Sequence, residues 1–231
     1  MRKMYVVLFT ILLLLSISLF GCGGGGSSST TSSLPYIEAL LFSFAGSTPA
    51  NLPNAMVVVT NSSGAAITNA TVVMNGVTLT YNSSVNHQQY EGIVSVAPGG
   101  SITLSVTAGG NTYTASGAQF AVYPTITFPL ANATITAGST NTVNWSPGSP
   151  LTTNTAYLLG VLDSADPIGG ATYFQGLTTS FNSYTIPVNS LTVGSRILIV
   201  GITTPVSIPN AAAGSYFVFG GFNYIPITVS P

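Results

Sequence analysis

Few residues in this 231-residue chain can carry chemistry. It contains one His, His87, and one Cys, Cys22, with four acidic and three basic residues. A structural zinc site takes about four Cys or His ligands, so none can be built, and a Ser-His-Asp or Cys-His site could use only His87. Two bases, Arg2 and Lys3, lie at the N-terminus, and Arg196 alone cannot neutralise a row of phosphates. Nucleic-acid binding is therefore excluded.

The most polar stretch, residues 81–90, surrounds the histidine. Amides and the imidazole lie there between two tyrosines, and amides flanked by aromatic rings can bind a neutral polyol such as a sugar. The candidate binding residues are Tyr81, Asn86, His87, Gln89 and Tyr90. The alternative is an ordinary solvated hairpin loop, because loops are generally polar.

The four acids form no clear catalytic or metal-binding pattern. Asp163 and Asp166 share a predicted loop, but Ca²⁺ takes about six to eight oxygen ligands, so a solvated turn is favoured. Glu38 and Glu91 could act as a glycosidase pair only with carboxyl groups roughly 5–9.5 Å apart, and nothing in the sequence brings them together. We expect no catalytic residue, no metal and no cofactor. A hydrolase is the least favoured alternative.

The N-terminus has the features of a secretory signal. Arg2 and Lys3 precede an apolar run over residues 4–20, typical of a signal peptide at residues 1–21. The sequence Leu-Phe-Gly-Cys at residues 19–22 resembles the lipobox of bacterial lipoproteins, which implies acylation of Cys22 and attachment to membrane lipid. The alternative is an uncleaved transmembrane helix, since the run of about 17 residues is just long enough to span a bilayer.

A tether follows the predicted anchor. Residues 23–33 contain only Gly, Ser and Thr, which cannot build a core and form a flexible linker. Gly23 stands where inner-membrane lipoproteins often carry Asp, so the resemblance implies the outer membrane of a bacterial cell envelope.

Beyond the tether the pattern is all-β. Period-two alternation and short β-branched runs recur between Gly, Asn, Pro and Ser clusters, and no stretch has apolar residues at helical spacing. The clearest strand is residues 101–107, with Ile102, Leu104 and Val106 facing a core. The other predicted strands are residues 56–60, 70–74, 93–96, 111–116, 125–128, 141–145, 157–162, 183–186, 196–203, 216–219 and 224–229.

Strand spacing of about 8–12 residues indicates β-sandwiches. We predict two tandem Ig-like sandwiches, residues 34–123 and 124–231, with a boundary near Tyr123-Pro124. Trp145 is expected in the core of the second, because Val143 points the same way. The aromatic run at residues 216–224 fits a core strand pair and an exposed apolar patch equally well.

The first predicted sandwich resembles the carboxypeptidase-regulatory-like domains. The likeness is carried by residues 57–61, 64–70, 90–92, 97–99 and 104–106. It implies a transthyretin-like, Ig-type fold with a spacer or scaffold role. The usual Thr-Asp turn before the Gly of that family is here Gln89-Tyr90-Glu91.

The second is similar to the N-terminal domain of the Kre9/Knh1 group of Ser/Thr-rich surface proteins, which is also Ig-like. The likeness is carried by residues 126–129, 134–138, 143–146, 184–187, 191–194 and 224–229. A Pro- and Ala-rich insertion at residues 204–214 departs from that family. The resemblance implies a surface module.

The low charge also bears on function. Only 3% of residues are charged, and no Lys follows Lys3 to protect a sheet edge from pairing with another chain. We therefore expect a non-enzymatic envelope lipoprotein with a structural or adhesive role. Its expected partners, an envelope protein or a neutral glycan, would be held without ion pairs, and a carbohydrate-binding lipoprotein is the main alternative.

Overall fold

The computed structural model describes residues 34–50, 52–84, 87–152, 154–167, 170, 173–177 and 182–231. This part of the chain contains no helix, and so none that could cross a membrane. Its strands are β1 (Tyr36–Phe44), β2 (Ala55–Thr60), β3 (Thr71–Met74), β4 (Val77–Thr78), β5 (Thr80–Asn82), β6 (Gln89–Gly92), β7 (Ser101–Ala108), β8 (Asn111–Ala118), β9 (Thr125–Phe128), β10 (Thr134–Thr136), β11 (Asn141–Ser146), β12 (Ala156–Asp163), β13 (Tyr173–Leu177), β14 (Ser183–Ile186), β15 (Gly194–Ser207) and β16 (Tyr216–Ser230). The all-β, Ig-like sandwich class predicted from the sequence is confirmed.

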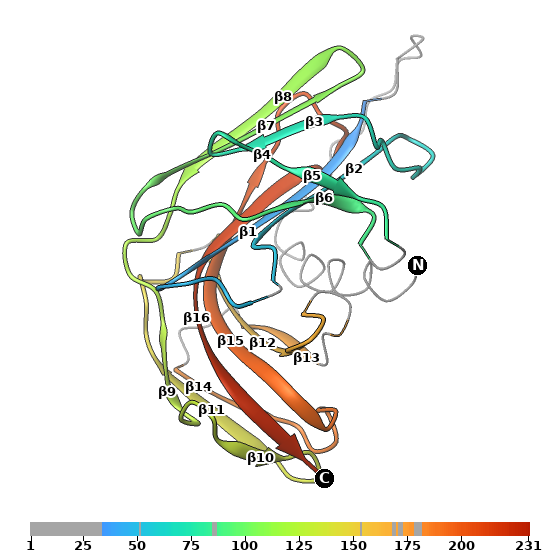
Figure 1. Cartoon of the computed structure of the whole chain (residues 1–231). Helices are drawn as coiled ribbons and strands as arrows, with labels where there is room; N and C mark the ends of the chain where they lie inside the picture. Colours follow the sequence, from blue (N-terminus) through green and yellow to red (C-terminus); the bar gives the residue numbers. More distant parts are fainter. Residues whose placement is uncertain are drawn as a thin grey trace.

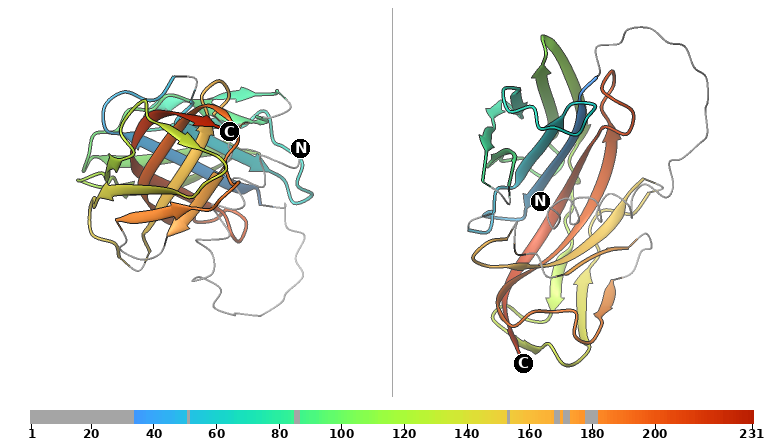
Figure 2. Two further views of the ribbon diagram at one scale, coloured as in Figure 1. Left: turned by 90° about the horizontal axis from the view of Figure 1, so that it is seen from below. Right: turned by 90° about the vertical axis from the view of Figure 1, so that its right-hand side faces the viewer.

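A nine-stranded sheet runs through the whole molecule. Its order is β13-β12-β15-β16-β1-β2-β6-β5, and β10 pairs with the end of β16. The long antiparallel hairpin of β15 and β16 extends from the upper to the lower part of the fold (Figures 1 and 2). β1 lies parallel to the first half of β16, and β12 lies antiparallel to β15. The C-terminal hairpin therefore belongs to both halves.

Two smaller sheets cover the same face of the long sheet. The upper one has the order β4-β3-β7-β8 and the lower one β14-β11-β9. The core under the upper sheet contains the predicted Ile102, Leu104 and Val106, together with Phe217 and Phe219 of β16. The core under the lower sheet includes Val143, Trp145, Leu159, Val200 and Ile227. Trp145 is thus a core residue, as predicted.

The opposite face of the long sheet carries a third apolar cluster. Leu40 and Phe42 of β1, Met56 of β2, Ile199 of β15 and Phe222 of β16 belong to it, and all are buried. Strands with both faces buried show continuous apolar runs instead of alternation. This explains the sequence of β1, which is apolar on both faces and was not among the predicted strands.

The predicted boundary at Tyr123-Pro124 does not coincide with a division of the sheet. β1 belongs to the first half of the sequence, yet one of its two neighbours is β16. The core of the first half also includes Ile208, Phe217 and Phe219 from the second. Whether the halves fold separately stays a prediction, but the strand pairing makes the first half depend on the last strand.

Three predicted strands are placed differently. Residues 93–96 were expected as a strand and are irregular, because the buried side chain of Asn54 forms hydrogen bonds of 2.8 Å with both the N–H and the C=O of Val94. Residues 216–219 and 224–229 belong to one strand, β16. Gly221 lets the ring of Tyr123 lie against the backbone, since a Cβ there would be 2.1 Å from that ring. The side chains of Phe217, Phe219 and Phe222 are buried, so this part of the aromatic run belongs to the core.

Candidate functional site

The sequence-predicted binding residues belong to the β5–β6 hairpin at one edge of the long sheet. Tyr81 pairs with Tyr90, and Asn82 pairs with Gln89. Successive side chains of a strand point to opposite faces, so the tyrosines share one face and the amides the other. The aromatic rings and the amides are therefore separated by the sheet itself. Asn86 lies outside the described residues.

The tyrosine face belongs to the upper core. Tyr90 is 3% exposed, and its hydroxyl accepts the Ala70 N–H at 2.8 Å and donates to the Ile67 carbonyl at 2.9 Å. Burial raises the pKa of Tyr90. The Tyr81 ring packs edge-on against the Tyr90 ring at 5.2 Å. Tyr90 has a structural role here, and its ring is not available to a glycan.

The amide face converges on the carboxylate of Glu91. Gln89 Nε2 donates to Glu91 Oε1 at 2.8 Å, and Asn82 Nδ2 donates to Oε2 at 3.0 Å. His87 Nδ1 lies 2.6 Å from Oε1. Three neutral or cationic groups thus surround one mostly buried carboxylate. Of the predicted binding residues, His87 and Gln89 contact this carboxylate, and Glu91 itself was not among them.

His87 also faces the other half of the molecule. Its Nε2 lies 3.9 Å from Oδ1 of Asp166, in the loop between β12 and β13. The two loops come from opposite ends of the strand order of the long sheet, β5–β6 and β12–β13. A protonated imidazole would present one N–H to Glu91 and the other toward Asp166. The arrangement places a carboxylate of each half beside the single imidazole.

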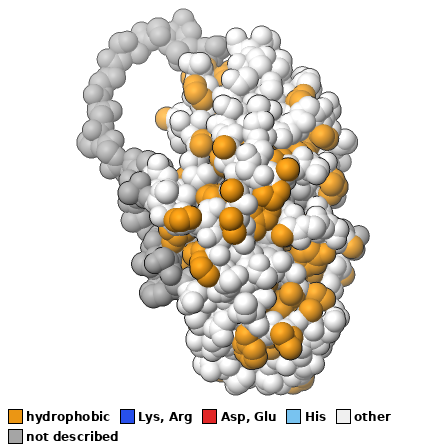
Figure 3. Space-filling view, turned by 90° about the vertical axis from the view of Figure 1, so that its left-hand side faces the viewer, with side chains coloured by type: hydrophobic (Ala, Val, Ile, Leu, Met, Phe, Trp, Pro, Cys, Tyr) orange, Lys and Arg blue, Asp and Glu red, His pale blue; other side chains and the backbone are white. Residues whose placement is uncertain are grey.

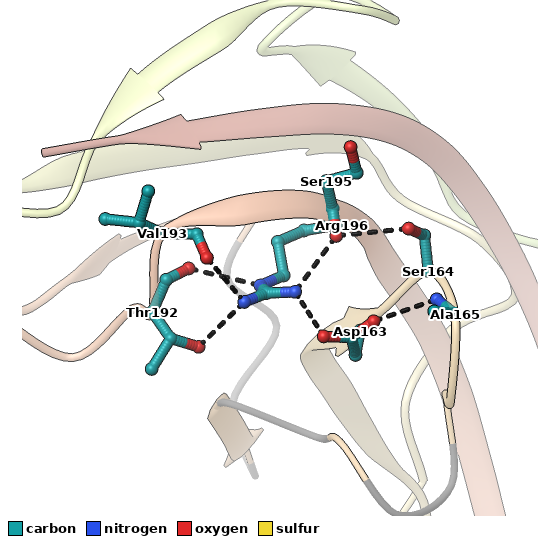
Figure 4. A network of polar contacts seen from close by, with 7 residues as sticks. All are labelled: Asp163, Ser164, Ala165, Thr192, Val193, Ser195 and Arg196. Carbon is teal, nitrogen blue, oxygen red and sulfur yellow. Dashed lines mark hydrogen bonds and ion pairs between the residues drawn. The ribbon is translucent and has the colours of Figure 1, made fainter.

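A second ion pair continues from this loop. Asp163 ends β12 and lies opposite Arg196 of β15, with 2.5 Å between Asp163 Oδ2 and Arg196 Nη1 (Figure 4). Asp163 Oδ1 accepts the Ala165 N–H at 2.8 Å. Hydrogen bonds from the Ala165 backbone, then the charge of Arg196, hold the pKa of Asp163 below its ordinary value. The backbone N–H of Asp166 contributes a further hydrogen bond to Asp163.

Arg196 is held by the protein on every side. Only 8% of the residue is exposed, and besides Asp163 its guanidinium donates to Thr192 O, Thr192 Oγ1, Val193 O and Ser195 O at 2.7–3.1 Å (Figure 4). The pair has the form of a structural clamp between β12 and the turn before β15. In the described part of the chain, no three His, Cys, Asp or Glu side chains are arranged to hold a metal ion.

The remaining acid, Glu38, lies apart from this network. It is on β1 opposite Tyr216 of β16, and its Oε1 accepts the Tyr36 hydroxyl at 2.7 Å. Burial raises the pKa of Glu38, and burial likewise raises the pKa of Tyr36. Glu38 and Glu91 are on separate strands with separate partners, and β2 lies between β1 and β6. The two glutamates share no hydrogen-bonded neighbour that would couple them as a catalytic pair.

The His87–Glu91 pair has one element of a hydrolytic site. A carboxylate that holds Nδ1 of a histidine leaves Nε2 to act as a general base in Ser-His-Asp enzymes. Among the described residues no Ser or Thr hydroxyl forms a hydrogen bond with Nε2 of His87. A hollow of about 590 Å³ lies elsewhere, beside Tyr36, Asn61 and Ala212, and none of its lining residues is charged. Within the described ranges, the geometry thus supplies an oriented imidazole with no hydroxyl hydrogen-bonded to its Nε2.

Sequence reasoning selected His87 and Gln89 but did not join them to Asp166 and Arg196. The contact between His87 and Asp166 links loops far apart in the sequence, and no local pattern announces it. The one available signal was the small number of charged residues, because buried charged residues are almost always paired and these have few partners besides one another.

Comparison with known proteins found its matches among solved structures. No family model and no curated protein matches the sequence. Among solved structures, fibronectin(III)-like modules of Clostridium thermocellum CbhA align at 11% identity over 85% of this chain and 94% of theirs, with a TM-score of 0.27. The FN1-FN3 domains of chicken CNTN1 align at 10% identity over 76% of this chain and 62% of theirs (TM-score 0.27), and domains 4 and 5 of the S-layer protein SbsC at 15% over 86% and 98% (TM-score 0.20).

Proposed function

We propose that this protein is a non-enzymatic lipoprotein of a bacterial cell envelope, anchored through acylated Cys22, and that its folded part is a structural or adhesive surface module. Export and lipidation are supported by the signal-like N-terminus and the lipobox-like residues 19–22. The role of the folded part is supported by its sandwich architecture.

One observation carries the non-enzymatic assignment: the charged groups bond to one another inside the fold. Glu91 is surrounded by three side-chain partners, Arg196 by five acceptors, and Glu38 is buried against a tyrosine. General acid–base catalysis needs a titrating group within hydrogen-bond reach of substrate. Groups satisfied in this way serve to hold loops and strands in place.

The proposed binding surface is a neutral face of the molecule. The face in Figure 3 shows apolar side chains in small groups among polar ones, with no charged side chain in view. Such a surface holds a partner by shape, apolar area, neutral hydrogen bonds or strand pairing. These forces are little affected by salt, whereas steering by charge is screened.

The test measures how much of the protein binds to envelopes isolated from cells that do not make it, at a series of salt concentrations. Binding should change less than about threefold between about 50 and 500 mM salt, because a neutral binding face has no charges whose attraction salt would screen. A steep loss of binding with salt would contradict the proposal. Turnover of an ester, peptide or glycan substrate that His87→Ala abolishes would move the protein to the hydrolases.

The anchor is tested separately. Cys22→Ala should release the full chain from membranes, with Cys22→Ser as a variant of similar size that also lacks the thiol. Retention of both variants after an alkaline wash would indicate a transmembrane anchor instead of acyl chains.

A further inference from the structure

The upper covering sheet ends in a strand with an open edge. β8 pairs with β7 on one side and with no strand on the other among the described residues. It lies along the outer margin of the upper half in Figure 1. Its eight residues contain neither a charge nor a proline, the two devices that most often prevent edge strands from pairing.

The hairpin geometry identifies which backbone groups face outward. Gly109 and Gly110 both have positive φ, as a two-residue type I′ turn requires, so Ala108 and Asn111 form a hydrogen-bonded pair. Bonded and non-bonded pairs alternate along an antiparallel ladder. At the other end of the β7–β8 hairpin, the Gln119 N–H donates a hydrogen bond of 2.8 Å to Gly100 O, as this alternation of bonded and non-bonded pairs requires. Thr112, Thr114 and Ser116 therefore direct their N–H and C=O groups to the open edge.

The same three residues carry exposed hydroxyl side chains. Thr112, Thr114 and Ser116 lie opposite Thr107, Ser105 and Thr103 of β7, and the Thr107 and Thr112 hydroxyls are 2.9 Å apart. Alternate residues Tyr113 and Ala115 are buried in the upper core. The edge is thus flat and neutral, with hydroxyls on one face and the core behind it.

The other edges in the described part are shorter or protected. β4, β5 and β10 have two or three residues, and β13 has five. β9 and β14 run directly into Pro129 and Pro187, and the part of β15 beyond its pairing with β12 contains Pro205. β8 stands alone as a long edge without such a device.

We propose that β8 pairs antiparallel with β8 of a second copy of this chain, joining the two upper sheets into one across a two-fold axis. Thr114 would lie opposite Thr114 of the partner subunit, and Thr112 opposite Ser116 of the partner subunit. This register uses Thr112, Thr114 and Ser116, and the neighbouring Thr and Ser side chains would pair across the axis. The pairing itself does not depend on the proposed adhesive function; only its role in the cell rests on that proposal.

Electrical neutrality favours a second copy as the occupant. A two-fold interface places each residue near its own copy, so any charge on the edge would repel itself. Neither β8, its neighbour β7, nor β3 on the far side of β7 carries a charge. A pair of short edges buries less than the roughly 1,200–2,000 Å² of stable interfaces, so the dimer should be weak in solution. Tethering on one membrane would raise the effective concentration and favour it.

The test is disulfide cross-linking of the full chain in its native envelope. Thr114→Cys should give a disulfide-linked homodimer on mild oxidation, because opposed residues of paired strands lie within the Cα separation of a disulfide. Thr103→Cys is the matched control, since it is an exposed threonine on the same face whose strand has neighbours on both sides. We expect about tenfold more dimer from Thr114→Cys than from Thr103→Cys, an effect of proximity. The unsubstituted chain reports any link through Cys22.

A second variant tests the backbone pairing. Adding Thr112→Pro to Thr114→Cys removes an N–H that points away from β7, so the β7–β8 ladder should remain. The cross-link should fall about tenfold, to the level of the control, while the thermal unfolding midpoint changes little. Equal cross-linking by Thr103→Cys and Thr114→Cys, no homodimer, or a link to a different protein would overturn the proposal. None of these results depends on whether Cys22→Ala releases the chain or on the salt response of envelope binding.

Discussion

Phe217 gives the sharpest test of how the two halves depend on each other. It lies in the last strand of the sequence, yet its fully buried side chain packs in the core of the N-terminal half, beside Phe219 at 5.4 Å between ring centroids. Replacing it with alanine leaves a cavity in that core. Phe→Ala changes at such sites cost about 3–5 kcal/mol, a large share of the roughly 5–15 kcal/mol that stabilises a domain.

The location of the damage matters more than its size. If the halves were independent along the sequence, Phe217→Ala would weaken only the part formed by residues 124–231. Because β16 is a strand of both sandwiches, we expect the amides of β7 and β8 to lose hydrogen-exchange protection by about 3–5 kcal/mol. For a cooperative unit of this size the unfolding midpoint should fall by about 6–20 °C.

Ile227→Ala is the matched control on the same strand. Ile227 is 3% exposed and faces the lower core, so its loss should first reduce protection in β9 and β11, at a cost of about 2–5 kcal/mol. Unchanged protection of β7 and β8 in Phe217→Ala, with a loss confined to β9 and β11, would refute the reasoning. The assay is residue-resolved hydrogen exchange on the full chain at neutral pH.

Two further predictions concern the Asp163–Arg196 clamp and Gly221. Because the pKa of Asp163 is lowered in the folded protein, its contribution to stability is complete above the ordinary aspartate pKa of about 3.9. That contribution is lost as pH falls through the lower pKa of the folded state. Asp163→Asn should therefore remove this part of the loss of stability in acid. At pH 7 the same variant should be less stable by about 1.5–3 kcal/mol in urea unfolding, because a charge-assisted hydrogen bond is lost; an unchanged pH profile would exclude the clamp. Gly221→Ala should destabilise the fold by about 1–3 kcal/mol, since a Cβ would lie 2.1 Å from the Tyr123 ring, and Tyr123→Ala should largely rescue it; thermal unfolding of the single and double variants measures this coupling.

The sequence predicts strands best where one face of the strand is buried and the other is exposed to solvent. Alternation in β7 correctly placed Ile102, Leu104 and Val106 in a core. β1 lacks alternation because both its faces are buried, so the same reasoning missed it. Residues 216–219 and 224–229 were predicted as separate strands, whereas Gly220 and Gly221 lie between them within one strand and make room for close contacts.

The sequence could predict which residues belong to the candidate site, but not which of them contact one another. Composition alone selected His87 as the one imidazole, and the polar loop selected Gln89. Their joint partner, Glu91, follows from strand alternation once the hairpin register is known, since residues 89 and 91 share a face. The approach of Asp166 depends on how the whole sheet brings its outer loops together, and a linear sequence carries no period that encodes it.

The placement of the charges bears on what the molecule can tolerate. Charges that serve solubility are dispersed over a surface, where mutual repulsion keeps copies apart. Here His87, Glu91, Asp163, Asp166 and Arg196 form one series of contacts, and the remaining acid, Glu38, is buried near tyrosines. The outer surface therefore has little repulsion against a second copy, and the open edge of β8 has none. A protein free in solution at high concentration would be at risk of aggregation from such an edge, whereas on a tethered protein the same edge can pair only with copies that the membrane presents in a favourable orientation.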